Sequence, residues 1–240
     1  MRCPRCQGEQ DDDRLECLHC GVVFSRYRPR PAAPAREEAP GTAWGWLRER
    51  MFQEEPAEDR FMVGVRGLFL VFLLVWGIRL LRLPCQGEAL MDSFMHLVNL
   101  PFHEAGHFVF RPFGHFLHIL GGTLGQLLVP LVVVAAFLRE GDPFGASVGV
   151  WWLGESLMDC APYIDDARSR TLLLLSGETG QEDWEGHDWY QILSRLGWLQ
   201  HDHGLARAAW LAGGLLLLAA LAWGGWVLWR QARTPAAQAS

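Results

Sequence analysis

The sequence predicts an all-α polytopic membrane protein with about four or five transmembrane helices and a small zinc ribbon at its N-terminus. Half of the 240 residues are hydrophobic, and long apolar runs fill the chain after its first quarter. Four cysteines near the N-terminus occur as two C-x-x-C pairs. We divide the chain into a ribbon at 1–28, a linker at 29–60, a membrane domain at 61–230 and a tail at 231–240.

The four N-terminal cysteines have the spacing of a structural zinc site. Cys3 and Cys6 form CPRC, and Cys17 and Cys20 form CLHC after a gap of ten residues. Such pairs can place four thiolates around one Zn²⁺, and a domain of about 25 residues buries too little core to fold without it. Two disulfides are the alternative, but no secretory signal peptide precedes the cysteines. The segment is similar to the short zinc ribbons that open many bacterial membrane proteins.

The linker is rich in Pro, Ala, Arg and Glu, and Trp44, Trp46 and Phe52 within it indicate a short helix at the membrane interface. Arginines close to membrane spans favour the cytoplasmic side. We therefore expect a multi-pass protein of the bacterial inner membrane whose N-terminus is cytoplasmic, where the ribbon could bind a protein partner. The net charge is −6, so no nucleic-acid partner is expected. Seven arginines lie between Cys20 and the first apolar run: Arg26, Arg28, Arg30, Arg36, Arg48, Arg50 and Arg60.

Five apolar segments are candidate membrane spans. Phe61–Leu83 carries arginines near its ends, and Phe116–Leu138 and Ala208–Trp229 contain no charged residue. The other two segments are Ala89–Phe110, which has several polar residues, and Phe144–Ile164, which contains two acidic residues. Polar groups are tolerated at membrane depth where they face a protein interior or a wet cavity. The last of these segments is the doubtful fifth span.

The most specific motif is the pentapeptide HEAGH in Ala89–Phe110, a HExxH sequence. On a helix, His103 and His107 share one face a turn apart, so both imidazoles can bind one Zn²⁺ while Glu104 acts on the attacking water. This is the pattern of a zinc hydrolase. The alternative is a chance match whose histidines are hydrogen-bonded core residues.

A catalytic zinc usually has three protein ligands, and two histidines leave one to be found. Asp188 could be that ligand or the N-cap of a helix over Trp189–Leu199. Asp166 could be the ligand or belong to a hydrated span end. We favour Asp188 slightly, with Asp166 as the alternative. Further candidates are Asp159, Asp165 and His187.

The run HEAGHFVF, followed by RPFGHFLHILGG and GGTLGQLLVPLVVV, resembles the site-2 protease family of intramembrane zinc metallopeptidases. In that family the next span opens with a Gly-Pro-x-x-Asn-like element, and Gly121, Gly122 and Gln126 stand at the corresponding place. The family's later ligand-bearing element resembles DCAPYIDDA, which would give the role of third ligand to Asp166. A smaller branch uses an Asp further along, which GHDW would match through Asp188.

These patterns together predict a membrane zinc metalloendopeptidase that hydrolyses peptide bonds of membrane proteins or peptides in or near the bilayer. Two histidines and an Asp would hold the catalytic zinc, and Glu104 would be the general base. One alternative is an inert membrane scaffold whose ribbon binds a protein partner, and another is a metal-handling protein. Neither alternative requires Glu104. Candidates for the cavity wall or for stabilising the oxyanion are His96, Asn99, His115 and His118.

Overall fold

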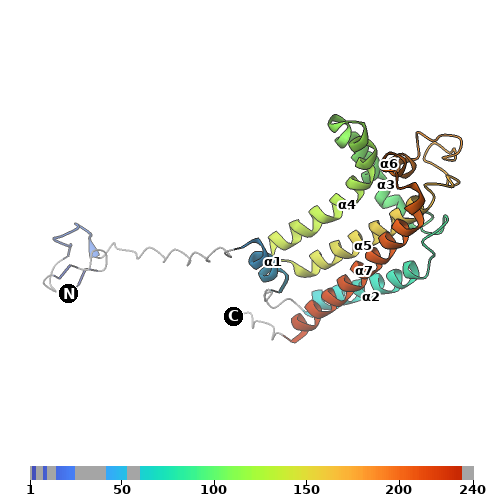
Figure 1. Ribbon diagram of the computed structural model, residues 1–240. Coiled ribbons are helices and arrows are strands. Elements are labelled where there is room, and N and C mark those ends of the chain that lie inside the picture. Colours follow the sequence, from blue (N-terminus) through green and yellow to red (C-terminus); the bar gives the residue numbers. More distant parts are fainter. Residues whose placement is uncertain (1, 4–7, 10–14, 25–41, 53–59, 234–240) are drawn as a thin grey trace. The chain divides into compact units, whose positions relative to one another are not determined.

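The computed structural model describes residues 2–3, 8–9, 15–24, 42–52 and 60–233, which belong to two compact units, Met1–Trp46 and Leu47–Ser240. Over these residues the secondary structure is helical apart from isolated β-bridges, as predicted for an all-α protein. Two 3₁₀ turns, Arg111–Phe113 and Leu199–His201, connect helices. The helices are α1 (Ala43–Phe52), α2 (Arg60–Leu81), α3 (Phe94–Phe110), α4 (His115–Glu140), α5 (Pro143–Asp165), α6 (Asp188–Leu196) and α7 (Asp202–Arg233) (Figure 1).

In the N-terminal unit, the first cysteine of each C-x-x-C pair makes a matching backbone hydrogen bond. The backbone N–H of Cys3 donates to the carbonyl of Gly8, and that of Cys17 donates to Val22, each over 2.9 Å. Gly21 has a positive φ of 68°, a conformation that glycine adopts without strain. Cys3, Cys17 and Cys20 lie close together. Cys6 lies outside the described residues.

The second unit is a helical bundle in which α5 is enclosed by its neighbours. Gly154 of α5 and Gly213 of α7 lie opposite each other, and a Cβ on either would come within 2.7 Å of the other's carbonyl oxygen. Trp151 and Leu217 continue this contact in the main apolar core, to which α2 contributes Leu73. Small residues of this kind allow two helix backbones to approach closely.

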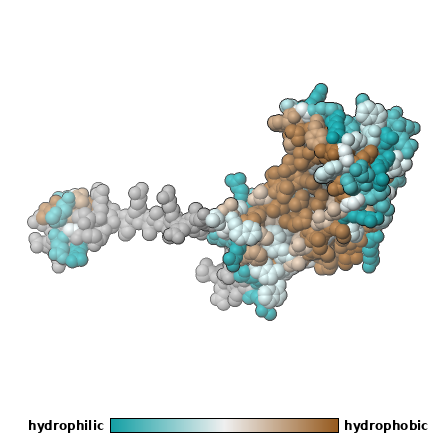
Figure 2. Space-filling model, viewed as in Figure 1, coloured by the Kyte–Doolittle hydropathy of each residue, from teal (hydrophilic) through white to brown (hydrophobic). Residues whose placement is uncertain are grey.

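Three helical segments are long and apolar enough to cross a membrane: Arg60–Leu81, His115–Glu140 and Leu199–Arg233. Apolar side chains on their outer faces are exposed, such as Leu68 at 75%, and Figure 2 shows a hydrophobic band over the helices. The structure therefore supports three spans, fewer than the four or five predicted.

The two predicted spans that contain polar residues, Ala89–Phe110 and Phe144–Ile164, do not combine the length and the apolar composition that a span needs. Helix α3 has only 17 residues, or about 25 Å, because it begins at Phe94, where the Ser93 side chain accepts a hydrogen bond from the N–H of His96. The hydrocarbon core is about 30 Å thick. Helix α5 is long enough, with 23 residues, but it carries buried acidic side chains.

Different helices mark the two ends of the bundle. At one end, Trp223 of α7 donates to the carbonyl of Met51 in α1, and Phe52 packs edge-on against Trp226. We call this the α1 end. Helix α1 itself confirms the short helix predicted within the linker. At the other end, Ile119 of α4 packs with residues of α6 (Figure 1). This α6 end holds the candidate site.

Candidate metal centre

The HEAGH motif lies on α3, at its crossing with α4. A Cβ on Gly106 would come within 2.0 Å of the carbonyl oxygen of Gly121, and one on Gly125 within 2.4 Å of the carbonyl oxygen of Phe102. No side chain fits between the two backbones at these positions. Because Gly106 of HEAGH has no side chain, α3 and α4 pack closely here, and the two histidines lie next to α4.

His103, His107 and Asp188 meet at one point, although Asp188 lies 85 residues from His103 in the sequence. The Oδ2 atom of Asp188 lies 3.0 Å from Nε2 of His103 and 3.2 Å from Nε2 of His107. Ligand atoms placed tetrahedrally at 2.0–2.1 Å from Zn²⁺ are about 3.3 Å apart. The spacing of the three groups thus fits one metal ion.

The hydrogen bonds of the two rings aim their metal-binding nitrogens at Asp188. Nδ1 of His107 donates to the carbonyl oxygen of His118 over 2.8 Å, and Nδ1 of His103 lies 3.3 Å from Oε1 of Gln126. A carbonyl oxygen only accepts, so each Nδ1 carries a proton, and in the neutral ring Nε2 is the nitrogen left to bind a metal. Each Nε2 can donate a hydrogen bond to Asp188 when it is protonated, or share a cation with Asp188 when it is not.

Helix α4 leaves room for an ion at Gly122. A Cβ at this position would lie 2.5 Å from Nε2 of His103 and 2.6 Å from Nε2 of His107. Any side chain would fill the space onto which both nitrogens face. Because residue 122 has no side chain, this space stays open, which is a second and independent indication that the site fits a metal ion.

Asp188 is not the N-cap of α6, so that alternative for its role is wrong. His187 is the cap: its Nδ1 accepts the N–H of Tyr190 over 3.2 Å. Asp188 occupies the first turn instead, and its side chain is directed to the two histidines. Burial alone would raise its pKa, but hydrogen bonds with His103 and His107 lower the pKa of the Asp188 carboxyl below its usual value.

Asp166, the alternative third ligand, lies elsewhere and anchors the loop before α6. Its buried carboxylate accepts hydrogen bonds from Ser169 Oγ at 2.6 Å, Thr171 N at 2.9 Å and Leu172 N at 3.0 Å. It also accepts from Nε2 of His187 at 3.3 Å. Burial opposes ionisation, yet these hydrogen bonds, with His187 the largest contributor, hold the pKa of Asp166 well below its usual range.

The other candidate ligands are also engaged away from the two histidines. Asp165 accepts from Nδ1 of His203 over 2.6 Å, and Asp159 lies behind α3, where it contacts His96. Both nitrogens of His187 are used, one by Tyr190 and one by Asp166. Asp188 is therefore the acidic residue that the fold brings to the HEAGH histidines.

A cavity of about 600 Å³ opens over the metal centre. Glu104 is exposed and lines this cavity, as do His96, His115 and His118. Asn99 does not line it; this side chain is buried and donates to two acidic residues of α5. Three of the four predicted wall residues thus face the space in which a substrate would lie.

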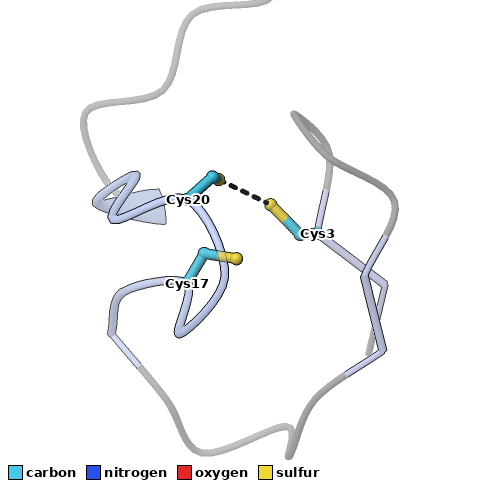
Figure 3. A group of neighbouring side chains, drawn as sticks. All are labelled: Cys3, Cys17 and Cys20. Atoms are coloured by element: carbon cyan, nitrogen blue, oxygen red, sulfur yellow. Dashed lines mark hydrogen bonds between the residues drawn. The ribbon is translucent and has the colours of Figure 1, made fainter.

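A second group of metal-binding side chains lies in the N-terminal unit. The sulfur atoms of Cys3, Cys17 and Cys20 lie within 4.8 Å of one another and point toward a common centre (Figure 3). The two Sγ atoms of Cys3 and Cys20 are 3.7 Å apart, far longer than a disulfide bond and close to the edge of about 3.8 Å expected around Zn²⁺. The described part of the ribbon fits one metal ion.

No family model, no curated protein and no solved structure matches this chain. The resemblance to site-2 proteases therefore stays a prediction that depends on the motif. Sequence reasoning named Gln126, Asp159 and Asn99 but missed that they are hydrogen-bonded to one another behind His103, and it missed the space at Gly122. The spacing of Gly121 and Gly125, two small residues four apart on a helix, was the available signal for a close helix crossing.

Proposed function

We propose that this protein is a zinc metallopeptidase embedded in the membrane, which hydrolyses peptide bonds near one surface of the bilayer. One observation carries the proposal: His103, His107 and Asp188 converge beside an exposed Glu104 in a single cavity. A bound Zn²⁺ would supply Lewis acidity, which polarises a peptide carbonyl and makes water more acidic.

Side chains of the protein would orient the metal ligands, transfer the proton and contact the peptide. The Nδ1 hydrogen bonds of His103 and His107 hold the rings in the orientation that a metal needs. Glu104, one residue after the first histidine, takes a proton from the attacking water and passes it to the departing amine. His115 and His118 also line the cavity and are placed to contact a bound peptide.

The depth of the site favours substrates close to the membrane surface. Gly122 follows His115, the first residue of α4, by seven residues, which is about 10 Å along the helix axis. Loop residues Leu173–Ser176 line the same cavity, so water reaches the site without crossing the bilayer. A peptide bond at or just beneath the surface fits this position better than one at the bilayer centre.

The side of the membrane follows from the arginine pattern. Helix α1, which carries Arg48 and Arg50, lies at the α1 end of the bundle, and the metal centre lies at the α6 end. With the N-terminus in the cytoplasm of a bacterial cell, the active site faces away from the cytoplasm. The zinc ribbon then remains on the cytoplasmic side, where it is available to a protein partner.

The proposal is tested with purified full-length protein in lipid nanodiscs, incubated with a mixture of membrane-protein fragments. We expect new peptide termini in mass spectrometry, lost on treatment with a chelator and restored by zinc. Protein that holds two zinc ions per chain but produces no new termini from any fragment would contradict the proposal and favour an inert scaffold.

A further inference from the structure

A network of buried polar side chains lies directly behind His103, and the mechanism proposed above uses only one of its contacts, that of Gln126 with His103. It joins α3, α4 and α5, and its acidic members are Glu155 and Asp159, which are 1% and 4% exposed. Buried carboxylates are costly unless they are fully hydrogen-bonded. The presence of two such carboxylates beside the metal centre therefore needs an explanation.

Asp159 is the centre of this network. Its carboxylate accepts from Nε2 of Gln126 over 2.8 Å and from Nδ2 of Asn99 over 3.1 Å, and it lies 3.0 Å from Nδ1 of His96. Glu155 accepts from the same Nδ2 of Asn99 over 2.9 Å. The two carboxylates thus share a partner, but contact with Gln126 is made by Asp159.

The orientation of the Gln126 amide follows from its acceptors. Its nitrogen faces Asp159 and also donates to the carbonyl of Ser156 over 3.3 Å. Neither acceptor can donate in return, so the amide nitrogen is held on that side and Oε1 must face Nδ1 of His103, 3.3 Å away. A flipped amide would point its N–H groups at His103 and favour the wrong ring tautomer.

We propose that Asp159 is a positioning residue for the metal centre: it locks Gln126, and through Gln126 it fixes His103 as a metal ligand. The inference rests on the proposed metal site and adds one residue beyond it. It also assigns the Gln126 nitrogen to its contact with Asp159, although both side chains line the cavity over the metal centre.

The test compares Asp159→Asn with Glu155→Gln, the matched change in the neighbouring carboxylate. Full-length protein in nanodiscs is titrated with Co²⁺ against a chelator. Thiolate charge-transfer absorption reports the ribbon ion, and visible d–d absorption without it reports the site at His103. We expect Asp159→Asn to weaken the second site about 10–100-fold, because an Asn amide lets Gln126 flip. Glu155→Gln should leave that affinity unchanged, and neither variant should alter the ribbon.

A double-mutant cycle separates positioning from general damage to the fold. If Asp159 acts through Gln126, then Gln126→Leu alone weakens the site, and Asp159→Asn adds no further loss in that background. Equal losses in Asp159→Asn and Glu155→Gln, or additive losses in the double variant, would overturn the inference. Should Asp159→Asn fail to fold, an unchanged affinity in Gln126→Leu would overturn it instead. A parent protein without Co²⁺ absorption at the second site would refute the proposed function itself.

Discussion

Replacing Gly122 with alanine should empty the membrane metal centre while leaving the fold intact. The new Cβ would lie 2.5 Å from Nε2 of His103 and 2.6 Å from Nε2 of His107. Ordinary contact begins at 3.4 Å, so the two nitrogens must retreat by 0.9 and 0.8 Å, the differences between these distances. Metal–ligand distances tolerate only about 0.2 Å.

The helix itself should not suffer from this change. Alanine is favoured over glycine inside a helix by about 1 kcal/mol, and the imidazole rings can rotate away without moving the backbone. We therefore expect unchanged helical content together with at least about a 100-fold loss of zinc affinity at this site, more than the loss of one supporting hydrogen bond usually causes.

The assay is zinc content and affinity of Gly122→Ala after purification, with Gly67→Ala as the control. Gly67 also lies in a membrane helix, α2, but a Cβ there would have no neighbour within 4 Å. Gly67→Ala should bind two zinc ions like the parent. If Gly122→Ala retains parental affinity at both sites, the ion does not lie between the histidines and α4, and the geometry argued above is wrong.

Three further outcomes are expected. Asp188→Ala should lose the membrane-site zinc. Asp166→Ala should keep this zinc at saturating concentration but lose about 3 kcal/mol of stability, because its loop hydrogen bonds are lost. If metal analysis shows zinc lost from Asp166→Ala and kept in Asp188→Ala, the two roles are exchanged. Because the folded-state pKa of Asp166 lies below its unfolded value of about 3.9, its hold on the loop should be complete at neutral pH and weaken only below about pH 4. Amide exchange at Leu172 that accelerates already at pH 6 would contradict this. Changing Cys3 and Cys6 to Ser should remove one zinc of two, as counted by atomic absorption, and leave the membrane site loaded.

Local sequence patterns predicted the parts of the site that depend on one helix. HEAGH fixes the relation of His103 to His107 because four residues are about one helical turn. Paired C-x-x-C units similarly predicted the clustering of Cys3, Cys17 and Cys20, which the structure shows for these three. Local geometry sets the spacing within HEAGH and within each C-x-x-C pair, whereas the meeting of the two pairs was predicted from the four ligands that one Zn²⁺ takes.

The choice of the acidic partner needed the tertiary fold. Asp166 and Asp188 have the same chemistry, and only the path of the loop between them decides which one reaches the histidines. The capping prediction failed because an imidazole nitrogen of His187 accepts the hydrogen bond that an Asp side chain was expected to accept. Such competition between neighbours is not visible in spacing.

The predicted span count exceeds the three helices that are long and apolar enough to cross a membrane, because two of the predicted segments are polar. Hydropathy registers how apolar a segment is, but it does not register whether the segment faces lipid or protein. Helix α5 is largely buried among other helices, and it accommodates Glu155 and Asp159 through hydrogen bonds from Asn99 of α3 and Gln126 of α4. The sequence shows the charges but not the partners that satisfy them.

The central claim is that Glu104 acts as the general base beside a zinc ion that it does not bind, and Glu104→Gln tests this claim most directly. Peptide hydrolysis by this variant should fall about 10²–10⁴-fold, because the amide cannot accept the proton of the attacking water. Zinc content, helical content and membrane insertion should equal those of the parent. A Gln variant that hydrolyses peptides at the parental rate, or that loses the membrane-site zinc, would contradict the account.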